Sequence, residues 1–141
     1  MENNTILTVI LDVNTSISTV WDAFTNPLTV KEWFFGTEQK TTWEVGTPII
    51  WSGEWEGQPY EDKGIVLAYE HEKYLKCNYW SSFSGTEDIP ENYANITYQV
   101  ADNEGNTKVT ITQDGFKNEE AKAHSETNWK AMMEEMKKLI E

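Results

Sequence analysis

The chain has 141 residues, of which 24 are acidic and 11 are basic, and its formal net charge is -13. Every basic residue is Lys, so the chain has no planar guanidinium group for phosphate, and its charge disfavours acidic surfaces. These features argue against nucleic acid as a partner and against membrane insertion, and they favour a small cargo that is neutral or weakly charged. Because 38% of the residues are hydrophobic and 13% are aromatic, a packed core is available, and we expect one domain over residues 1–141.

A strand and two short helices are the first predicted elements. Residues 5–13 alternate between apolar and polar positions, which is typical of a half-buried strand. Two helices follow, separated where Pro27 disfavours helical geometry at Asn26. Helices this short are unstable alone, so both must pack on a larger apolar surface. The apolar residues expected to form that contact are Ile17, Val20, Trp21, Phe24, Leu28, Val30, Trp33 and Phe34.

Antiparallel strands dominate the middle of the chain. We predict strands near residues 38–44, 48–55, 60–70 and 74–80, then a polar loop over residues 81–92. Strands at 93–101 and 108–114 are joined by turn residues 102–106. Alternation places Ile49, Trp51, Gly53 and Trp55 on one face, where Gly53 is expected to open space between two indoles.

The last predicted element is a long amphipathic helix that begins after Asn118, a favourable N-cap residue. One of its faces carries Ser125, Trp129, Met132, Met133, Met136, Leu139 and Ile140. This order of elements predicts an α+β fold in which the helix covers one face of an antiparallel sheet. A strongly curved sheet would leave a gap near the helix, and that gap is the candidate binding site.

Four motifs, in the right order over nearly the whole chain, resemble a known family. They are residues 20–27 with Trp33 and Phe34, residues 64–67 ahead of Tyr74 and Leu75, residues 107–112 with Gly115 and Phe116, and Asn128 with Trp129. Together they are similar to the Hsp90 ATPase activator homologue-like branch of the START-related, Bet v 1-like superfamily. The resemblance implies a helix-grip fold, in which a seven-stranded antiparallel sheet wraps around the C-terminal helix and encloses a hydrophobic cavity.

The resemblance also implies which side chains line that cavity. Trp33 and Phe34 would lie near its mouth, and Trp129, Met132 and Met133 would form its ceiling. The sheet would contribute Ile49, Trp51, Trp55, Tyr79, Tyr98, Gln113 and Phe116. A stripe of aromatic and methionine side chains is also typical of an ordinary hydrophobic core. For Trp21, Phe24, Met136 and Leu139 we favour a core position over a place in the cavity lining.

Signals of catalysis are sparse. Cys77 is the one cysteine, and its place in an alternating strand predicts a buried thiol rather than a nucleophile. His71 and His124 lie in charged surroundings that predict solvated side chains, and no metal or cofactor is expected. The acids around the 57–59 turn, Glu54, Glu56, Glu61 and Asp62, are interpreted as solvated charge.

Three hypotheses for the function remain open. The first is a cytoplasmic protein that binds a small apolar or aromatic molecule under the C-terminal helix, with no enzymatic activity. The second is a cyclase- or hydrolase-type enzyme that uses the same cavity. The third is a protein-interaction module, for example a chaperone partner, although 141 residues leave no room for a separate chaperone-binding domain. A monomer and a homodimer fit the sequence equally well.

Overall fold

The computed structural model describes residues 6–34, 36–81, 87–116 and 118–141, and the strands in these ranges form a seven-stranded antiparallel sheet in the order β1-β7-β6-β5-β4-β3-β2. The strands are β1 (Leu7–Val13), β2 (Glu38–Lys40), β3 (Pro48–Trp55), β4 (Gln58–Glu70), β5 (Tyr74–Tyr79), β6 (Ala94–Asn103) and β7 (Asn106–Gln113). The helices are α1 (Ile17–Thr25), α2 (Pro27–Trp33), the short 3-10 helix η1 (Pro90–Asn92) and α3 (Glu119–Ile140).

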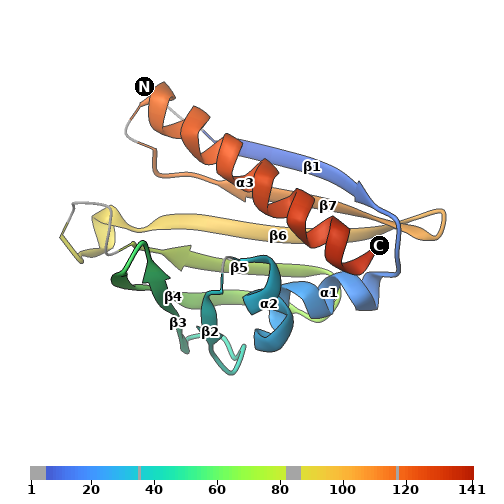
Figure 1. The fold of residues 1–141 in the computed structure, drawn as a ribbon, viewed down its shortest axis with the longest axis horizontal. Coiled ribbons are helices and arrows are strands. Elements are labelled where there is room, and N and C mark those ends of the chain that lie inside the picture. The colour runs from blue at the N-terminus through green and yellow to red at the C-terminus, as the bar shows by residue number, and fades with distance from the viewer. Residues whose placement is uncertain (1–5, 35, 82–86, 117) are drawn as a thin grey trace.

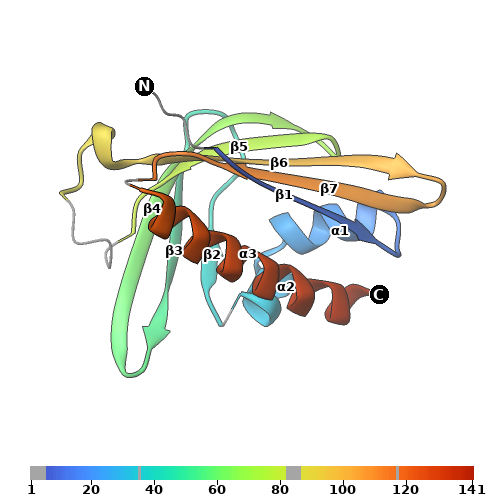
Figure 2. The same ribbon diagram turned by 90° about the horizontal axis from the view of Figure 1, so that it is seen from above.

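The sheet is curved, and all three α-helices lie on its concave side. Figures 1 and 2 show α3 running across the strands β1, β7 and β6, with α1 and α2 packed beside its C-terminal half. The β3–β4 hairpin projects on the same side as the helices (Figure 2). This arrangement confirms the prediction of an α+β helix-grip fold with the sheet wrapped around the long helix.

Local sequence signals account for the turns and helix ends. Glu104 and Gly105, which join β6 to β7, both have positive φ, at 54° and 94°. Two such residues make the tight hairpin turn that matches the twist of the strands, and the hairpin was predicted here. Asn26 ends α1 and also caps α2, because its side chain accepts a hydrogen bond from the Leu28 amide at 3.0 Å. Asn118 caps α3 through the Ala121 amide at 2.8 Å.

The alternation predicted for the first strand is confirmed by burial, and the β6–β7 hairpin shows the same period. Leu7, Val9 and Val13 are buried on β1, and Ile96, Val100, Val109 and Ile111 are buried on the β6–β7 hairpin. The predicted strand over 38–44 is shorter, because β2 ends at Lys40 and Trp43 has a φ of 64°, which a strand cannot accommodate. Part of the predicted loop over residues 81–92 lies outside the described residues, and its end forms η1.

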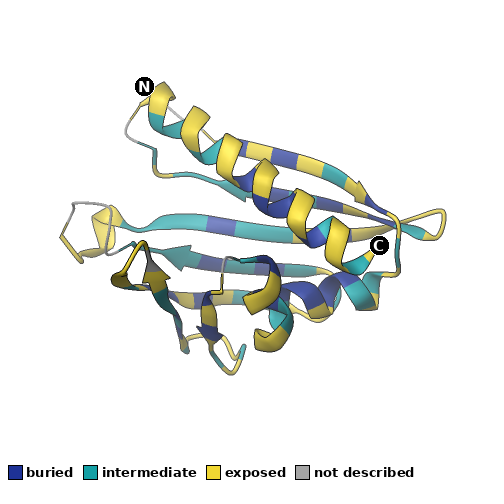
Figure 3. Cartoon of the chain, viewed as in Figure 1, coloured by how far each residue is buried: buried dark blue, intermediate teal, exposed yellow. Residues whose placement is uncertain are grey.

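Two predicted core residues are exposed instead. Leu28 is 75% exposed, because α2 buries its opposite side through Val30 and Trp33. Leu139 is 42% exposed, because the buried stripe of α3 continues from Met136 to Ile140 and leaves Leu139 on its flank. Figure 3 shows this stripe as dark bands confined to the C-terminal half of α3.

Candidate functional site

The concave face of the sheet differs between its two ends. At the closed end, next to α1, the inward side chains are almost inaccessible to solvent, and they include Val13, Leu75, Val109 and Met136 of α3. At the open end, the inward side chains Tyr79, Ala94 and Gln113 are only half-buried, as is Phe116 just after β7. Solvent therefore reaches the inner face at the end that lies under the N-terminal half of α3 (Figure 3).

Trp129 connects α3 to the sheet at the open end. Its indole Nε1 donates a hydrogen bond to Gln113 Oε1 at 2.7 Å, and its ring meets Tyr98 edge-on with the centroids 5.9 Å apart. Tyr98 in turn packs against Phe24 at 4.7 Å. Gln113 thus satisfies the polar atom of an indole that is 7% exposed, and the ring positions of Trp129 and Tyr98 are fixed by contacts on both sides.

A second aromatic group lies on β3 and β5. The rings of Trp51 and Tyr79 have centroids 5.3 Å apart and are tilted by 57°. Trp51 Nε1 donates to Gln39 Oε1 at 2.8 Å, while Gln39 Nε2 donates to the Phe24 carbonyl at 3.1 Å. The Tyr79 hydroxyl donates to Asp62 Oδ2 at 2.6 Å. This group combines two aromatic rings with a carboxylate.

The phenols and the thiol on the inner face are held neutral. Burial raises the pKa of Tyr79, and the nearby Asp62 carboxylate adds to the increase. Burial also raises the pKa of Tyr98, with smaller contributions from Cys77 and Tyr79. For Cys77, burial raises the pKa to about 12. At neutral pH the two hydroxyls therefore remain donors, and the thiol is not a thiolate.

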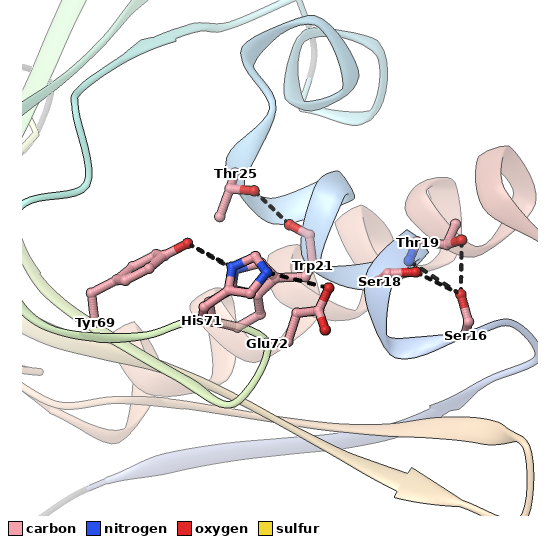
Figure 4. Close-up of polar contacts among 8 residues, drawn as sticks. All are labelled: Ser16, Ser18, Thr19, Trp21, Thr25, Tyr69, His71 and Glu72. Carbon is pink, nitrogen blue, oxygen red and sulfur yellow. Dashed lines mark hydrogen bonds and ion pairs between the residues drawn. The ribbon is translucent and has the colours of Figure 1, made fainter.

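A separate series of polar contacts lies at the edge of the sheet near α1 (Figure 4). Trp21 Nε1 donates to the Tyr69 hydroxyl at 3.0 Å, and that hydroxyl lies 3.3 Å from His71 Nδ1. His71 Nε2 is 3.4 Å from a Glu72 carboxylate oxygen, and the imidazole is 70% exposed. The expectation of an exposed His71 is thus confirmed. The series of contacts orients Tyr69, whose ring also stacks on Trp43.

Two hollows lined wholly by described residues lie on the outer face of the sheet rather than under α3. One is bordered by Glu70, Lys73, Tyr74, Gln99 and Lys108, and the other by Ile10, Asp12, Asp102 and Asn103. Within the described ranges no group of three or more His, Cys, Asp or Glu side chains is arranged to hold a metal ion. In the same residues no helix is long and apolar enough to cross a membrane.

A comparison with protein-family models matches residues 14–141 to the activator of Hsp90 ATPase homolog 1-like proteins. The chain belongs to this family. The match covers all three α-helices and six of the seven strands that the structure describes, so the resemblance inferred from the four sequence motifs is confirmed.

Solved structures of other proteins have the same fold. The solution structure of ChR145 from Cytophaga hutchinsonii is 38% identical, with a TM-score of 0.86, and the match covers 99% of this chain and 95% of that one. The solution structure of the Aha1 dimer from Colwellia psychrerythraea is 18% identical, with a TM-score of 0.77 and coverage of 98% and 97%. The crystal structure of MLL2253 from Mesorhizobium loti is 20% identical, with a TM-score of 0.78 and coverage of 96% for both chains. No curated protein matches the chain.

The residues predicted for the cavity fall into distinct environments in this family member. Trp33 is buried and donates Nε1 to the Ala23 carbonyl at 2.7 Å, which makes it part of the core, while Phe34 stacks on it and is half-buried. Ile49, Met132 and Met133 are also buried core residues. Tyr79, Gln113 and Phe116 are half-buried at the open end, where the buried rings of Trp51 and Trp129 contact Tyr79 and Gln113 respectively. Tyr98 packs against both Trp129 and Phe24 of α1, and the side chain of Trp55 lies outside the described residues.

Two expectations about β3 and β4 are wrong. Gly53 does not open an empty space, because a Cβ there would lie 2.7 Å from the Tyr60 hydroxyl, so the Tyr60 ring occupies that position. Glu54, Glu56 and Glu61 are exposed as expected, but Asp62 is buried, with 8% exposure. Strand alternation from Val66 back to Asp62 was the signal that would have placed this carboxylate on the inner face.

Proposed function

We propose that this protein binds a small, largely apolar or aromatic molecule at the open end of the concave face, beneath the N-terminal half of α3. The observation that supports the proposal is the contrast between the two ends. The inner face is fully packed beside α1, but Tyr79, Gln113 and Phe116 stay half-buried at the other end. Inward aromatic side chains that remain accessible are typical of a ligand site and are unfavourable in a finished core.

The chemistry of the open end suits such a ligand. Trp129, Trp51, Tyr79 and Tyr98 offer aromatic surface, and burying apolar ligand surface against them would contribute about 25 cal/mol per Å². The hydroxyls of Tyr79 and Tyr98 and the side chain of Gln113 provide a few polar groups that fix orientation.

Native mass spectrometry tests this proposal without a guess at the ligand. The protein is measured before and after exposure to a metabolite and lipid extract, and a discrete added mass is expected. Phe116→Ala removes a half-buried ring from the open end and is expected to weaken the adduct. Trp43→Ala, the control, removes an aromatic ring that belongs to the Tyr69 group and should keep the adduct.

Four outcomes separate the hypotheses. An adduct that disappears only in Phe116→Ala supports binding at the open end, whereas equal loss in both variants contradicts this location. No adduct from any extract contradicts the proposed function. A ligand that is released with an altered mass would instead support the cyclase- or hydrolase-type alternative.

A chaperone-related role is the second candidate, and the family match favours it. In that case purified Hsp90 would show faster ATP hydrolysis when this protein is added, and Phe116→Ala would leave the stimulation unchanged. An unchanged ATPase rate together with a retained small-molecule adduct would contradict the chaperone-related role.

A further inference from the structure

The two edges of the sheet differ in how they are protected against the addition of another strand. Among the described residues, β1 pairs only with β7, and β2 pairs only with β3. Figures 1 and 2 show β1 as the outermost strand on the side of the sheet away from β2. The outward backbone N–H and C=O groups of an edge strand can bind a further strand, so natural edges are usually short, charged or interrupted.

β2 has this protection. It consists of only three residues, Glu38–Lys40, and both of its ends carry charged side chains. Glu38 also forms ion pairs with Lys31 at 3.7 Å and with Lys40 at 3.8 Å. An edge this short and this charged is a poor template for another strand.

β1 lacks these features. It is seven residues long, contains no Lys and no Pro, and pairs with β7 in one continuous register, so it has no bulge. Its one charged side chain, Asp12, accepts hydrogen bonds from Asn103 Nδ2 and Asn106 Nδ2, each at 3.1 Å, and is thus held toward the β6–β7 hairpin. Ile10 in the middle of the strand is 59% exposed. β1 is therefore a regular and largely apolar edge.

The sequence of β1 is complementary to a second copy of itself. Ile10 is the middle residue of the strand, so an antiparallel pair with a two-fold axis at Ile10 pairs all seven residues of both copies. In this register Ile10 lies opposite Ile10 of the second copy, and Asp12 lies opposite Thr8. No charged side chain then lies opposite a like charge, and the exposed apolar side chains meet.

Pairing of two β1 edges also gives a closed assembly. A β1 edge bound to a β2 edge would leave one edge free at each end and would continue into a filament. A β1–β1 pair leaves only the short, charged β2 edges outside. The net charge of -13 repels a second copy, but at physiological ionic strength this repulsion is screened beyond about 8 Å.

We propose that two copies of this chain associate through antiparallel pairing of their β1 strands about Ile10, which joins their two sheets into one. The interface consists mainly of one strand from each copy and is therefore small, so the dissociation constant is expected to be micromolar or weaker. The inference is independent of the proposed function, because the outer edge of β1 does not belong to the concave face that carries the candidate site.

Sedimentation velocity at physiological salt, over protein concentrations from about 10 μM to about 1 mM, tests this proposal. The unmodified chain is expected to shift from monomer to dimer. Ile10→Lys places two ammonium groups opposite each other and removes the central apolar contact, so it should weaken the dimer at least about tenfold. Thr8→Lys adds the same charge to the same face, but opposite Asp12 of the second copy, so it should keep or tighten the dimer.

Leu28→Lys is the control for the loss of an exposed apolar side chain. Leu28 is 75% exposed on α2, which lies beside β2 rather than β1 (Figure 1), so the dimer should be unchanged. A chain that stays monomeric at about 1 mM overturns the proposal and leaves the β1 edge to a strand of another protein. An unchanged dimer in Ile10→Lys overturns the interface, and equal weakening by Ile10→Lys and Thr8→Lys overturns the register.

Hydrogen exchange on the unmodified protein gives an answer that does not depend on the folding of any variant. The outward amides of β1 gain hydrogen-bond partners in the dimer, so they should exchange more slowly at about 1 mM than at about 10 μM. Amides of the β2 edge should exchange equally fast at both concentrations. Protection that appears on other elements but not on β1 overturns the proposal.

Discussion

Three ionisable side chains on the inner face are all held in their neutral forms. Burial is the first cause of the raised pKa values of Cys77, Tyr79 and Tyr98, and these residues belong to the adjacent strands β5 and β6. Among the described residues, no positive charge contributes to these shifts by favouring the ionised form. The folded state therefore loses stability as the solution becomes alkaline, and this loss can be assigned to single residues.

For Cys77, the raised pKa determines the pH range in which stability is lost. The thiol has a pKa of 9.0 when exposed and about 12 when buried, so above pH 9.0 the unfolded chain releases a proton that the folded chain keeps. The free energy of unfolding should be unaffected below pH 9.0 and should then fall by up to about 1.4 kcal/mol per pH unit. Urea denaturation of the wild type and Cys77→Ala at pH values on both sides of 9.0 measures this, because the variant lacks the thiol. Identical slopes above that pH would contradict the assignment.

At the scale of elements, α3 illustrates how narrow the helix–sheet contact is. Its buried residues are Trp129, Met132, Met133 and Met136, and the next residue on that line is Ile140. Leu139 has the same apolar character as its neighbours but faces solvent. The position of a residue around the helix axis therefore decides its contribution to stability more than the type of its side chain does.

Truncations in the last turns of α3 test this difference directly. Met136 is fully buried, so Met136→Ala should lower the free energy of unfolding by about 2–5 kcal/mol through lost contacts and a cavity. Leu139→Ala, at 42% exposure, should change it by less than about 1 kcal/mol. Chemical denaturation of both variants gives the comparison, and similar losses would show that the last turn packs differently.

The side chain of Asn26 contributes hydrogen bonds on both sides of the junction of α1 and α2. Asn26 accepts from the Leu28 amide and donates Nδ2 to Asp22 Oδ1 at 3.1 Å, so it connects the end of one helix to the start of the next. Asn26→Ala should cost about 1 kcal/mol of stability through the lost cap. Asn128→Ala, at an exposed position inside α3, is the control and should be nearly neutral. The melting temperatures of the two variants measure the effect. Equal decreases in melting temperature would contradict the capping role of Asn26.

Elements determined by nearby residues were predictable from the sequence. Pro27 separates the two helices and Gly105 allows the β6–β7 turn, and both features appear where expected. The shortening of β2 was not predictable, because it depends on Trp43, which donates Nε1 to the Thr25 carbonyl at 3.2 Å while its backbone adopts a positive φ. That contact joins residues 18 positions apart in the sequence.

The candidate site was predictable in its aromatic residues but not in its charge. Period-two alternation and the family resemblance brought together Trp51, Tyr79 and Trp129. The burial of Asp62 arises from its pairing with Trp51 and its hydrogen bond to Tyr79, which is 17 residues away. A short acidic turn in the sequence gives no sign of such a distant partner, so the carboxylate was interpreted as solvated.

At the scale of the whole molecule, the sheet has one firmly packed end and one accessible end. The closed end joins β1, β6, β7 and α1 through side chains with no measurable exposure, such as Val13 and Val109. A hydrogen bond from the Asn14 amide to Glu141 Oε2, at 2.8 Å, also links the segment after β1 to the end of α3. Opening of this end requires disruption of the core itself, whereas the other end depends on fewer buried contacts.

Hydrogen exchange measures this difference amide by amide. Backbone amides of β7 near Val109 should exchange only through global unfolding, whereas those of β5 near Tyr79 and of α3 before Trp129 should exchange faster through local opening. A ligand bound at the open end would slow the second group most, because it stabilises only states in which that end is formed. Equal protection of both ends without ligand would mean that the half-buried aromatic residues belong to a rigid core, and the proposed site would then lose its structural basis.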